Sequence, residues 1–135
     1  MYVKRIVEDD WCGVRSDDVE YECSKIEQVV AAITKLNGGN KTSVYLQGDG
    51  ENSLTVSGGN DGRYIAFVTI GVDDEFYNLV DLTQRDDQML DVVTGGQRGT
   101  YPAKQCVGLR TAVQAARQFA LDGSMSPSFA WQKQA

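Results

Sequence analysis

The sequence predicts an α+β fold in which two helices pack on one face of an antiparallel β-sheet of about five to seven strands. Apolar residues recur at helical spacing in two segments, and they alternate with polar residues in several segments between them. Glycine pairs at 38–39, 58–59 and 95–96 mark turns. Short turns favour antiparallel neighbours, and an amphipathic helix has to bury its apolar face. The length of 135 residues fits one domain, so residues 1–135 are expected to fold as a single unit.

The chain is expected to begin with a strand at residues 2–7, YVKRIV. An acidic, polar loop follows at residues 8–18, and Trp11 lies inside it. Residues 19–23 alternate in polarity, which predicts either a short strand or the approach to the first helix.

A capping box predicts the start of a helix at residues 24–37. In this motif the Ser24 hydroxyl accepts from the backbone three residues on, and the Glu27 side chain reaches back to Ser24. One apolar stripe then follows at helical spacing: Ile26, Val29, Val30, Ile33 and Leu36. The sequence Asn-Gly-Gly at 37–39 supplies the left-handed end of the helix.

The middle of the chain predicts an antiparallel meander of roughly five strands. The expected strands are residues 42–48, 52–59, 62–71, 75–82 and 88–93. Their connections, such as Gly-Asp-Gly and Gly-Gly-Asn-Asp-Gly, have the composition of hairpin turns. The third segment, GRYIAFVTIG, is the longest and most apolar, as expected of a central strand.

The last third predicts a second helix at residues 109–122 and a closing strand at residues 128–131. The apolar face of this helix comprises Leu109, Ala112, Val113, Ala116, Phe119 and Ala120. Gly123 ends the helix, and Pro127 imposes an extended step into Ser-Phe-Ala-Trp. Phe119 and Trp131 are expected in the core, where they close the helix onto the sheet.

Composition narrows the classes of function. With 13 basic and 19 acidic residues the net charge is −6, which does not suit direct nucleic-acid binding. The charge suits either a basic protein partner or solubility alone. Histidine is absent, which removes Ser-His-Asp triads, Cys-His pairs and His-ligated zinc. Three cysteines without a C-x-x-C pair, and a charged start without a signal peptide, favour the reducing cytoplasm. Apolar runs are too short to cross a membrane.

The region from Gly95 to Trp131 carries several features in a fixed order. They are Gly95-Gly96, Tyr101-Pro102, the small-residue helix from Ala112 to Phe119, Gly123, Pro127 and Trp131. This order resembles the C-terminal part of immunity protein family one of bacterial polymorphic toxin systems. Members of that family are often encoded beside nucleic-acid deaminase toxins.

The resemblance implies a bacterial cytoplasmic protein that binds and neutralises one cognate toxin by stoichiometric, one-to-one occlusion. The implied toxin is a nucleic-acid deaminase or a nuclease. The resemblance implies no catalytic residue, cofactor, metal, nucleic acid or membrane partner. The family's toxin contacts differ between members, so no contact residue is carried over.

Acidic clusters are the first candidates for toxin contacts. Asp73, Asp74 and Glu75 form one cluster, and Asp86 and Asp87 with Asp91 form another. Carboxylates of this kind can occupy the basic path along which a toxin holds nucleic acid. The alternative is that these residues only form solvated turns. If the contacts form, charge reversal at the first cluster slows association with the toxin at low salt.

Aromatic residues and one turn arginine complete the candidate site. Interfaces are enriched in Trp and Tyr, and the candidates here are Trp11, Tyr45, Tyr64, Phe76, Tyr77 and Tyr101. Trp11 is either an interface anchor or a lid over the core. The sequence Gly-Gly-Gln-Arg-Gly at 95–99 lacks the ending of a phosphate-binding loop, so we expect a flexible turn. The alternative is an exposed binding loop in which Arg98 is a polar contact.

Two other functions stay open at this stage. A small carboxylate-dependent enzyme requires two acids that converge in a pocket with shifted pKa values. A regulatory or scaffold module requires a different protein partner and no effect on any toxin.

Overall fold

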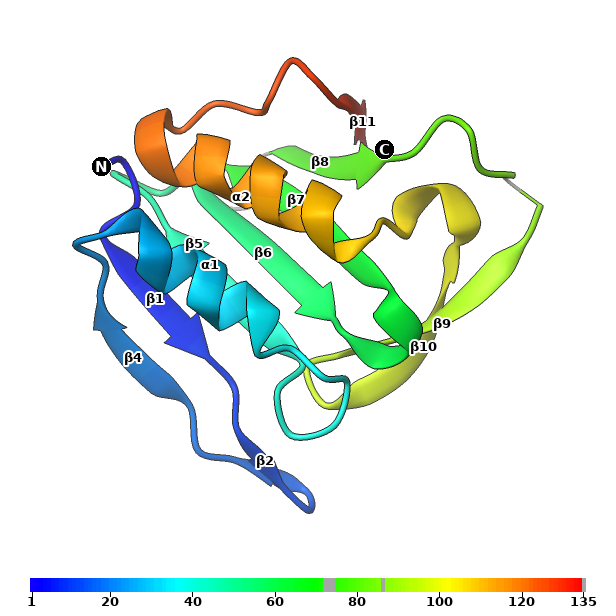
Figure 1. The fold of residues 1–135 in the computed structure, drawn as a ribbon, viewed down its shortest axis with the longest axis horizontal. Helices are drawn as coiled ribbons and strands as arrows, with labels where there is room; N and C mark the ends of the chain where they lie inside the picture. The colour runs from blue at the N-terminus through cyan, green and yellow to red at the C-terminus, as the bar shows by residue number, and fades with distance from the viewer. Residues whose placement is uncertain (72–74, 86, 135) are drawn as a thin grey trace.

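The computed structural model describes residues 1–71, 75–85 and 87–134. Two α-helices, α1 (Ile26–Thr34) and α2 (Leu109–Asp122), accompany a large antiparallel sheet and two small ones, so the predicted α+β class is confirmed (Figure 1). The strands are β1 (Arg5–Glu8), β2 (Trp11–Cys12), β3 (Arg15–Ser16), β4 (Val19–Glu22), β5 (Ser43–Gln47), β6 (Ser53–Gly58), β7 (Tyr64–Ile70), β8 (Glu75–Val80), β9 (Met89–Thr94), β10 (Gln97–Pro102) and β11 (Ala130–Lys133). Short 3₁₀ turns occupy Asn60–Gly62 and Ala103–Gln105.

The large sheet has seven strands in the order β11-β8-β7-β6-β5-β1-β4, and every neighbouring pair is antiparallel. The predicted meander is present from β5 to β8. The N-terminal strand β1 adds beside β5, and the C-terminal strand β11 adds beside β8.

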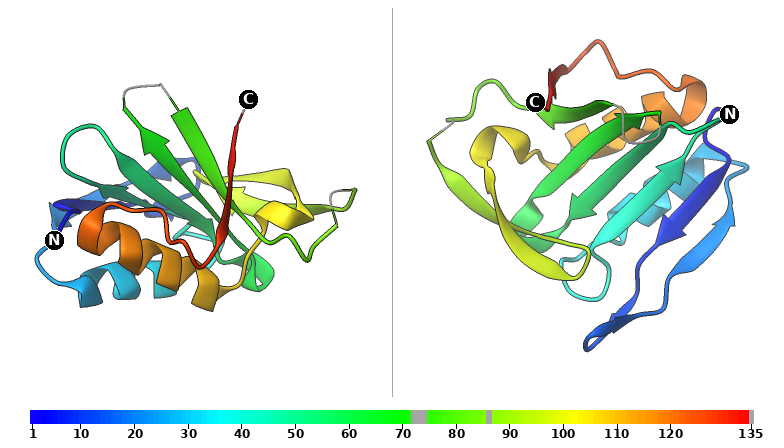
Figure 2. Two further views of the ribbon diagram at one scale, coloured as in Figure 1. Left: turned by 90° about the horizontal axis from the view of Figure 1, so that it is seen from above. Right: turned by 180° about the vertical axis from the view of Figure 1, so that it is seen from behind.

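Both helices lie side by side on one face of this sheet, as the sequence predicts (Figures 1 and 2). Phe119 of α2 is fully buried there, and its ring meets the ring of Tyr2 edge-on at 5.5 Å. Ile33 of α1 and Leu54 of β6 are also fully buried in this core. The alternation along each strand therefore sends the other set of side chains to the opposite, helix-free face.

The start of α1 differs from the prediction. Its N-cap is Lys25, and the Gln28 side chain accepts from the backbone N–H groups of Ser24, at 2.7 Å, and Lys25, at 3.0 Å. The predicted capping box of Ser24 and Glu27 is therefore wrong, because Gln28 satisfies the same donors. The bounds of α2 match the prediction, and Gly123 ends it with a φ of 80°.

Two hairpins lie outside the large sheet, and both correct the sequence prediction. The predicted loop at 8–18 contains the small β2–β3 hairpin, which projects beyond the sheet (Figure 1). The segment predicted as the fifth strand of the meander forms β9, which pairs with β10 in a separate two-stranded sheet. Residues 97–102, predicted in part as a flexible turn, are the strand β10.

The cysteine thiols and the lengths of the helices are the last features of the fold. Cys12 is exposed, whereas Cys23 and Cys106 are buried, and all three are free thiols. Burial raises the pKa of both buried thiols. Neither helix in the described part of the chain has the length and apolar character needed to cross a membrane.

Candidate partner-binding face

The helix-free face of the large sheet has a row of side chains that runs across five strands. Tyr45 of β5 pairs with Thr55 of β6, and Thr55 pairs with Phe67 of β7. Val7 of β1 continues the row on one side, and Asn78 of β8 continues it on the other. Paired residues of antiparallel strands point to the same face, so these side chains form one continuous strip.

The strip combines aromatic rings with small hydroxyl side chains. Tyr45 is 37% exposed, Phe67 is partly exposed, and the Phe67 ring centroid lies 6.4 Å from that of Phe76. Hollows lie on both sides of the strip: one of about 450 Å³ reaches from Tyr45 to Phe76, and one of about 330 Å³ reaches from Phe67 to Tyr101. A shallow apolar surface with hydroxyl groups at its centre resembles the centre of a protein interface more than an enclosed substrate pocket.

Two hairpins flank this face. The β9–β10 hairpin packs over one end of it, where Val92 and Ile65 are buried and Tyr101 is partly buried (Figure 2). The β2–β3 hairpin stands at the other side, and its Trp11 is partly exposed. The backbone N–H groups of Gly95 and Gly96 donate to the hydroxyls of Ser43, at 3.1 Å, and Thr42, at 3.0 Å, and these bonds hold the tip of β9–β10.

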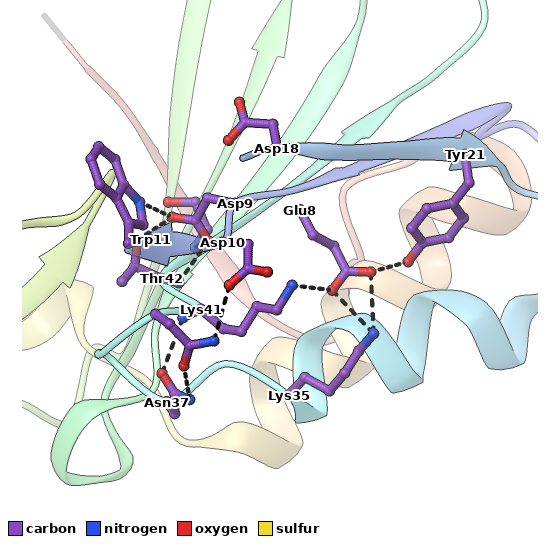
Figure 3. A network of polar contacts seen from close by, with 12 residues as sticks. Glu8, Asp9, Asp10, Trp11, Asp18, Tyr21, Lys35, Asn37, Lys41 and Thr42 are labelled. Atoms are coloured by element: carbon purple, nitrogen blue, oxygen red, sulfur yellow. Dashed lines mark hydrogen bonds and ion pairs between the residues drawn. The ribbon is translucent and has the colours of Figure 1, made fainter. Parts of the chain in front are cut away.

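Asp9 fixes the base of the β2–β3 hairpin. This residue is 9% exposed, and its carboxylate accepts from the backbone N–H groups of Thr42, at 2.7 Å, and Ser43, at 3.0 Å. It also accepts from the Thr42 hydroxyl and, at 2.8 Å, from Trp11 Nε1 (Figure 3). Four donors that converge on one buried carboxylate hold the indole ring in one orientation.

Glu8, the residue before Asp9, turns to the helix side of the sheet (Figure 3). It is 3% exposed and lies 3.2 Å from Lys35 Nζ and 3.9 Å from Lys41 Nζ. It also accepts a hydrogen bond from the Tyr21 hydroxyl. Burial, and then this hydrogen bond to a carboxylate, raise the pKa of Tyr21 well above its ordinary value.

The Glu8 carboxylate is held mainly by charge. Its Oε1 atom lies 3.2 Å from Lys35 Nζ, at an angle that does not make a hydrogen bond, while Oε2 accepts from both Lys35 and Tyr21. Alternation along β1 thus separates two buried carboxylates. Glu8 meets cations under the helix layer, whereas Asp9 meets neutral donors beside the hairpins.

The model of one protein family, immunity protein Imm1, matches residues 15–133 of this chain. The chain belongs to that family. A comparison with curated proteins and one with solved structures gave no significant match. Membership of the Imm1 family confirms the resemblance of the C-terminal features and makes the protein an immunity protein whose partner is a toxin protein.

The structure of this Imm1 protein distributes the acidic candidates over different places. Asp73, Asp74 and Asp86 lie outside the described residues. Glu75 points to the helix side of β8, where a hydrogen bond from Tyr77 and the charge of Lys133, 3.6 Å away, lower the pKa of its carboxyl.

The two other described acidic candidates are also paired. Asp87 lies 2.9 Å from Arg85, and the hydrogen bonds from Arg85 lower the pKa of the Asp87 carboxyl. Asp91 of β9 lies 3.5 Å from Arg98 of β10, so these two candidates face each other across the hairpin. Each of the three described acidic candidates, Glu75, Asp87 and Asp91, is thus paired with a cation of this chain.

Of the aromatic candidates, the structure brings Trp11, Tyr45, Phe76 and Tyr101 to the helix-free face. Trp11 stands at one side of the face, and Tyr101 lines the hollow at the other. Tyr64, also considered from the sequence, is buried in the core at 6% exposure. Sequence reasoning missed Phe67, although the alternation of β7 assigns it to the face opposite Ala66 and Val68.

Proposed function

We propose that this immunity protein neutralises one cognate toxin by binding it in a one-to-one complex through the helix-free face. The toxin is a nucleic-acid deaminase or a nuclease, made by the same bacterial cell, and the complex forms in the cytoplasm. Residues 1–135 act in it as a single domain. The immunity protein occludes the toxin and performs no catalysis.

The observation that carries this proposal is the strip of Tyr45, Thr55 and Phe67 across the centre of the sheet. Helices cover the other face of the sheet, while this strip remains partly exposed between the two hairpins. Aromatic side chains on both sides of a hydroxyl side chain supply apolar contact area and a hydrogen-bonding group, and protein interfaces use both.

The net charge of −6 supports a nucleic-acid-acting toxin as the partner. A protein that holds a nucleic-acid strand needs basic residues along the phosphate path. Opposite charges speed the encounter of the two proteins, and an immunity protein has to capture its toxin before the toxin acts on many substrates. We expect a dissociation constant of about 1 nM or lower.

Co-expression with the toxin domain encoded beside this protein tests the proposal. Bacteria that produce the toxin alone should die, and bacteria that produce both should survive and yield a one-to-one complex. A catalytically inactive toxin serves as the control for binding without selection. If two folded proteins give neither survival nor a complex, the toxin proposal is wrong for this pair. A self-associated oligomer without rescue would instead support a scaffold role.

A further inference from the structure

A third hollow lies beside the strip, between the β2–β3 hairpin and β5, and we call it the Trp11 pocket. It has a volume of about 480 Å³ and is lined by Val7, Asp9, Trp11, Ser16, Asp18, Ser43, Tyr45 and Gly95. It therefore joins a segment near the N-terminus to β5 and to the tip of the β9–β10 hairpin. Two aromatic side chains and two carboxylates line one cavity.

Among the described residues, neither carboxylate of the Trp11 pocket has a cationic partner. Asp9 accepts only from neutral groups of Thr42, Ser43 and Trp11. Asp18 accepts from the Ser16 hydroxyl at 2.5 Å. Within the described part of the chain, no Lys or Arg nitrogen lies within 4.0 Å of either carboxylate. Glu8, by contrast, has Lys35 and Lys41 beside it.

The charges on the two faces of the molecule also favour a cationic ligand on the helix-free face. On the strands of the large sheet, the charged side chains of the helix-free face are Arg5, Glu20 and Glu22. Arg5 is paired with Glu20 at 2.5 Å, and Glu51 lines the neighbouring hollow. The two helices and their capping residues carry Lys25, Lys35, Arg110 and Arg117 against Glu27 and Asp122. The named side chains of the helix-free face are thus mainly acidic, whereas those of the helices are mainly basic.

We infer that the Trp11 pocket accepts an arginine or lysine side chain of the partner protein. A cation in the pocket pairs with the Asp18 carboxylate and lies against the rings of Trp11 and Tyr45, which attract cations through their electron-rich faces. The buried charge of Asp9 adds to this attraction, because only neutral donors surround it. The identity of that partner as a toxin rests on the proposed function.

Pre-organisation favours this pocket over the paired acids elsewhere. Glu75, Asp87 and Asp91 each face a cation of this chain, so a partner's cation has to displace it. Asp18 has no such competitor among the described residues, and the hydrogen bond from Trp11 Nε1 to Asp9 already orients the indole ring. Binding then costs little rearrangement of the free protein.

A titration with small probes tests the chemistry of the pocket without the toxin. The indole N–H signals of Trp11 and Trp131 are followed by NMR while N-acetyl-arginine amide is added, and N-acetyl-citrulline amide serves as the uncharged isostere. We expect a saturable shift of the Trp11 signal in the roughly millimolar range with arginine only. The Trp131 signal, from the core side of β11, should stay in place.

Asp18→Asn should abolish the arginine-dependent shift, because asparagine keeps an acceptor for Ser16 but removes the charge. Asp17→Asn is the matched control, since Asp17 is adjacent, exposed and already paired with Arg15 at 3.1 Å. Equal shifts with arginine and citrulline, or no shift up to about 100 mM arginine, would overturn the inference for a ligand of this size.

The toxin complex supplies the second readout. Asp18→Asn should weaken binding to the toxin domain about tenfold, and Asp17→Asn should change it by less than about twofold. Unchanged toxin affinity in Asp18→Asn would overturn the inference even if the probe binds. The probe titration does not use the toxin, so probe binding without any toxin complex would refute the proposed function while supporting the pocket.

Discussion

The indole ring of Trp11 lies directly on the backbone of Gly96. A Cβ atom added to Gly96 would come within 2.4 Å of Trp11 Cε2, and Gly96 has a φ of +76°. This contact joins the β2–β3 hairpin to the tip of the β9–β10 hairpin. The two hairpins that flank the helix-free face therefore form one frame, although their sequences are far apart.

Replacing Gly96 with alanine should destabilise the protein through this contact. The left-handed backbone costs about 1 kcal/mol with a side chain, and displacing the packed indole costs roughly 2 kcal/mol more. Gly95→Ala is the matched control, because Gly95 also has a positive φ, of +59°, but no atom lies near its added Cβ. Urea unfolding should show a loss of about 3 kcal/mol for the first variant and about 1 kcal/mol for the second. Equal losses would show that Trp11 does not resist the new methyl group.

Asp9→Asn should lower stability by about 2 kcal/mol. An asparagine amide keeps one acceptor oxygen but turns its NH₂ group toward donors that Asp9 now satisfies on Thr42, Ser43 and Trp11. Asp10→Asn is the control, since the Asp10 carboxylate is less buried and accepts from Asn40 Nδ2 at 3.1 Å. Chemical unfolding, with tryptophan fluorescence as the probe, checks both variants. Similar losses in both would contradict a special role for the buried carboxylate.

The sequence predicted those helices and strands whose ends are set by residues close to them in the chain. The apolar periodicity of α2 and the glycine after it fix both ends of that helix within the sequence itself. The predicted start of α1 was wrong because Ser24, Glu27 and Gln28 can all form cap hydrogen bonds. In the folded helix it is Gln28 that forms them. The alternation of apolar and polar residues in 88–93 predicted a strand, but it does not show which strand pairs with it. The separate β9–β10 hairpin was therefore not predicted.

The candidate site needed contacts between distant segments. The sequence of an acidic run does not show whether its carboxylates are paired with cations. Glu75, for example, is paired with Lys133, which lies far from it in the sequence. The Trp11 pocket is assembled from residues around Asp9, from Tyr45 and from Gly95, so no local motif marks it. Composition gave the acidic character of the molecule, while only the fold places the unpaired carboxylates on the helix-free face.

The contact of partly buried Tyr21 with buried Glu8 should make the stability of the protein depend on pH in the alkaline range. Desolvation, and then the hydrogen bond to Glu8, raise the pKa of Tyr21 from its ordinary value of 10.0. Above that value the unfolded chain loses the phenol proton while the folded chain keeps it. The stabilisation is complete below pH 10 and declines as the pH rises toward the folded pKa.

Tyr21→Phe removes this proton and should flatten the fall in the free energy of unfolding above pH 10. The other tyrosines contribute equally to both proteins, so the difference between the two curves isolates Tyr21. Urea unfolding at a series of alkaline pH values measures it. Parallel curves for the wild type and the variant would contradict the raised pKa.

Thr55→Arg should block the proposed interface at its centre. Thr55 lies between Tyr45 and Phe67 in the strip, and a long charged side chain there has to be buried without a partner when the toxin binds. We expect the affinity for the toxin domain to fall by at least about 100-fold and rescue of growth to be lost.

The matched control for this change is Gln114→Arg, which adds the same side chain to the exposed surface of α2. It should leave the affinity within about twofold, because the helix layer does not take part in the proposed complex. Calorimetry with the purified toxin domain compares both variants after urea unfolding has shown that each is folded. Wild-type affinity in Thr55→Arg, together with lost affinity in Gln114→Arg, would place the toxin on the helices. The strip across the sheet would then not be the surface that binds the toxin.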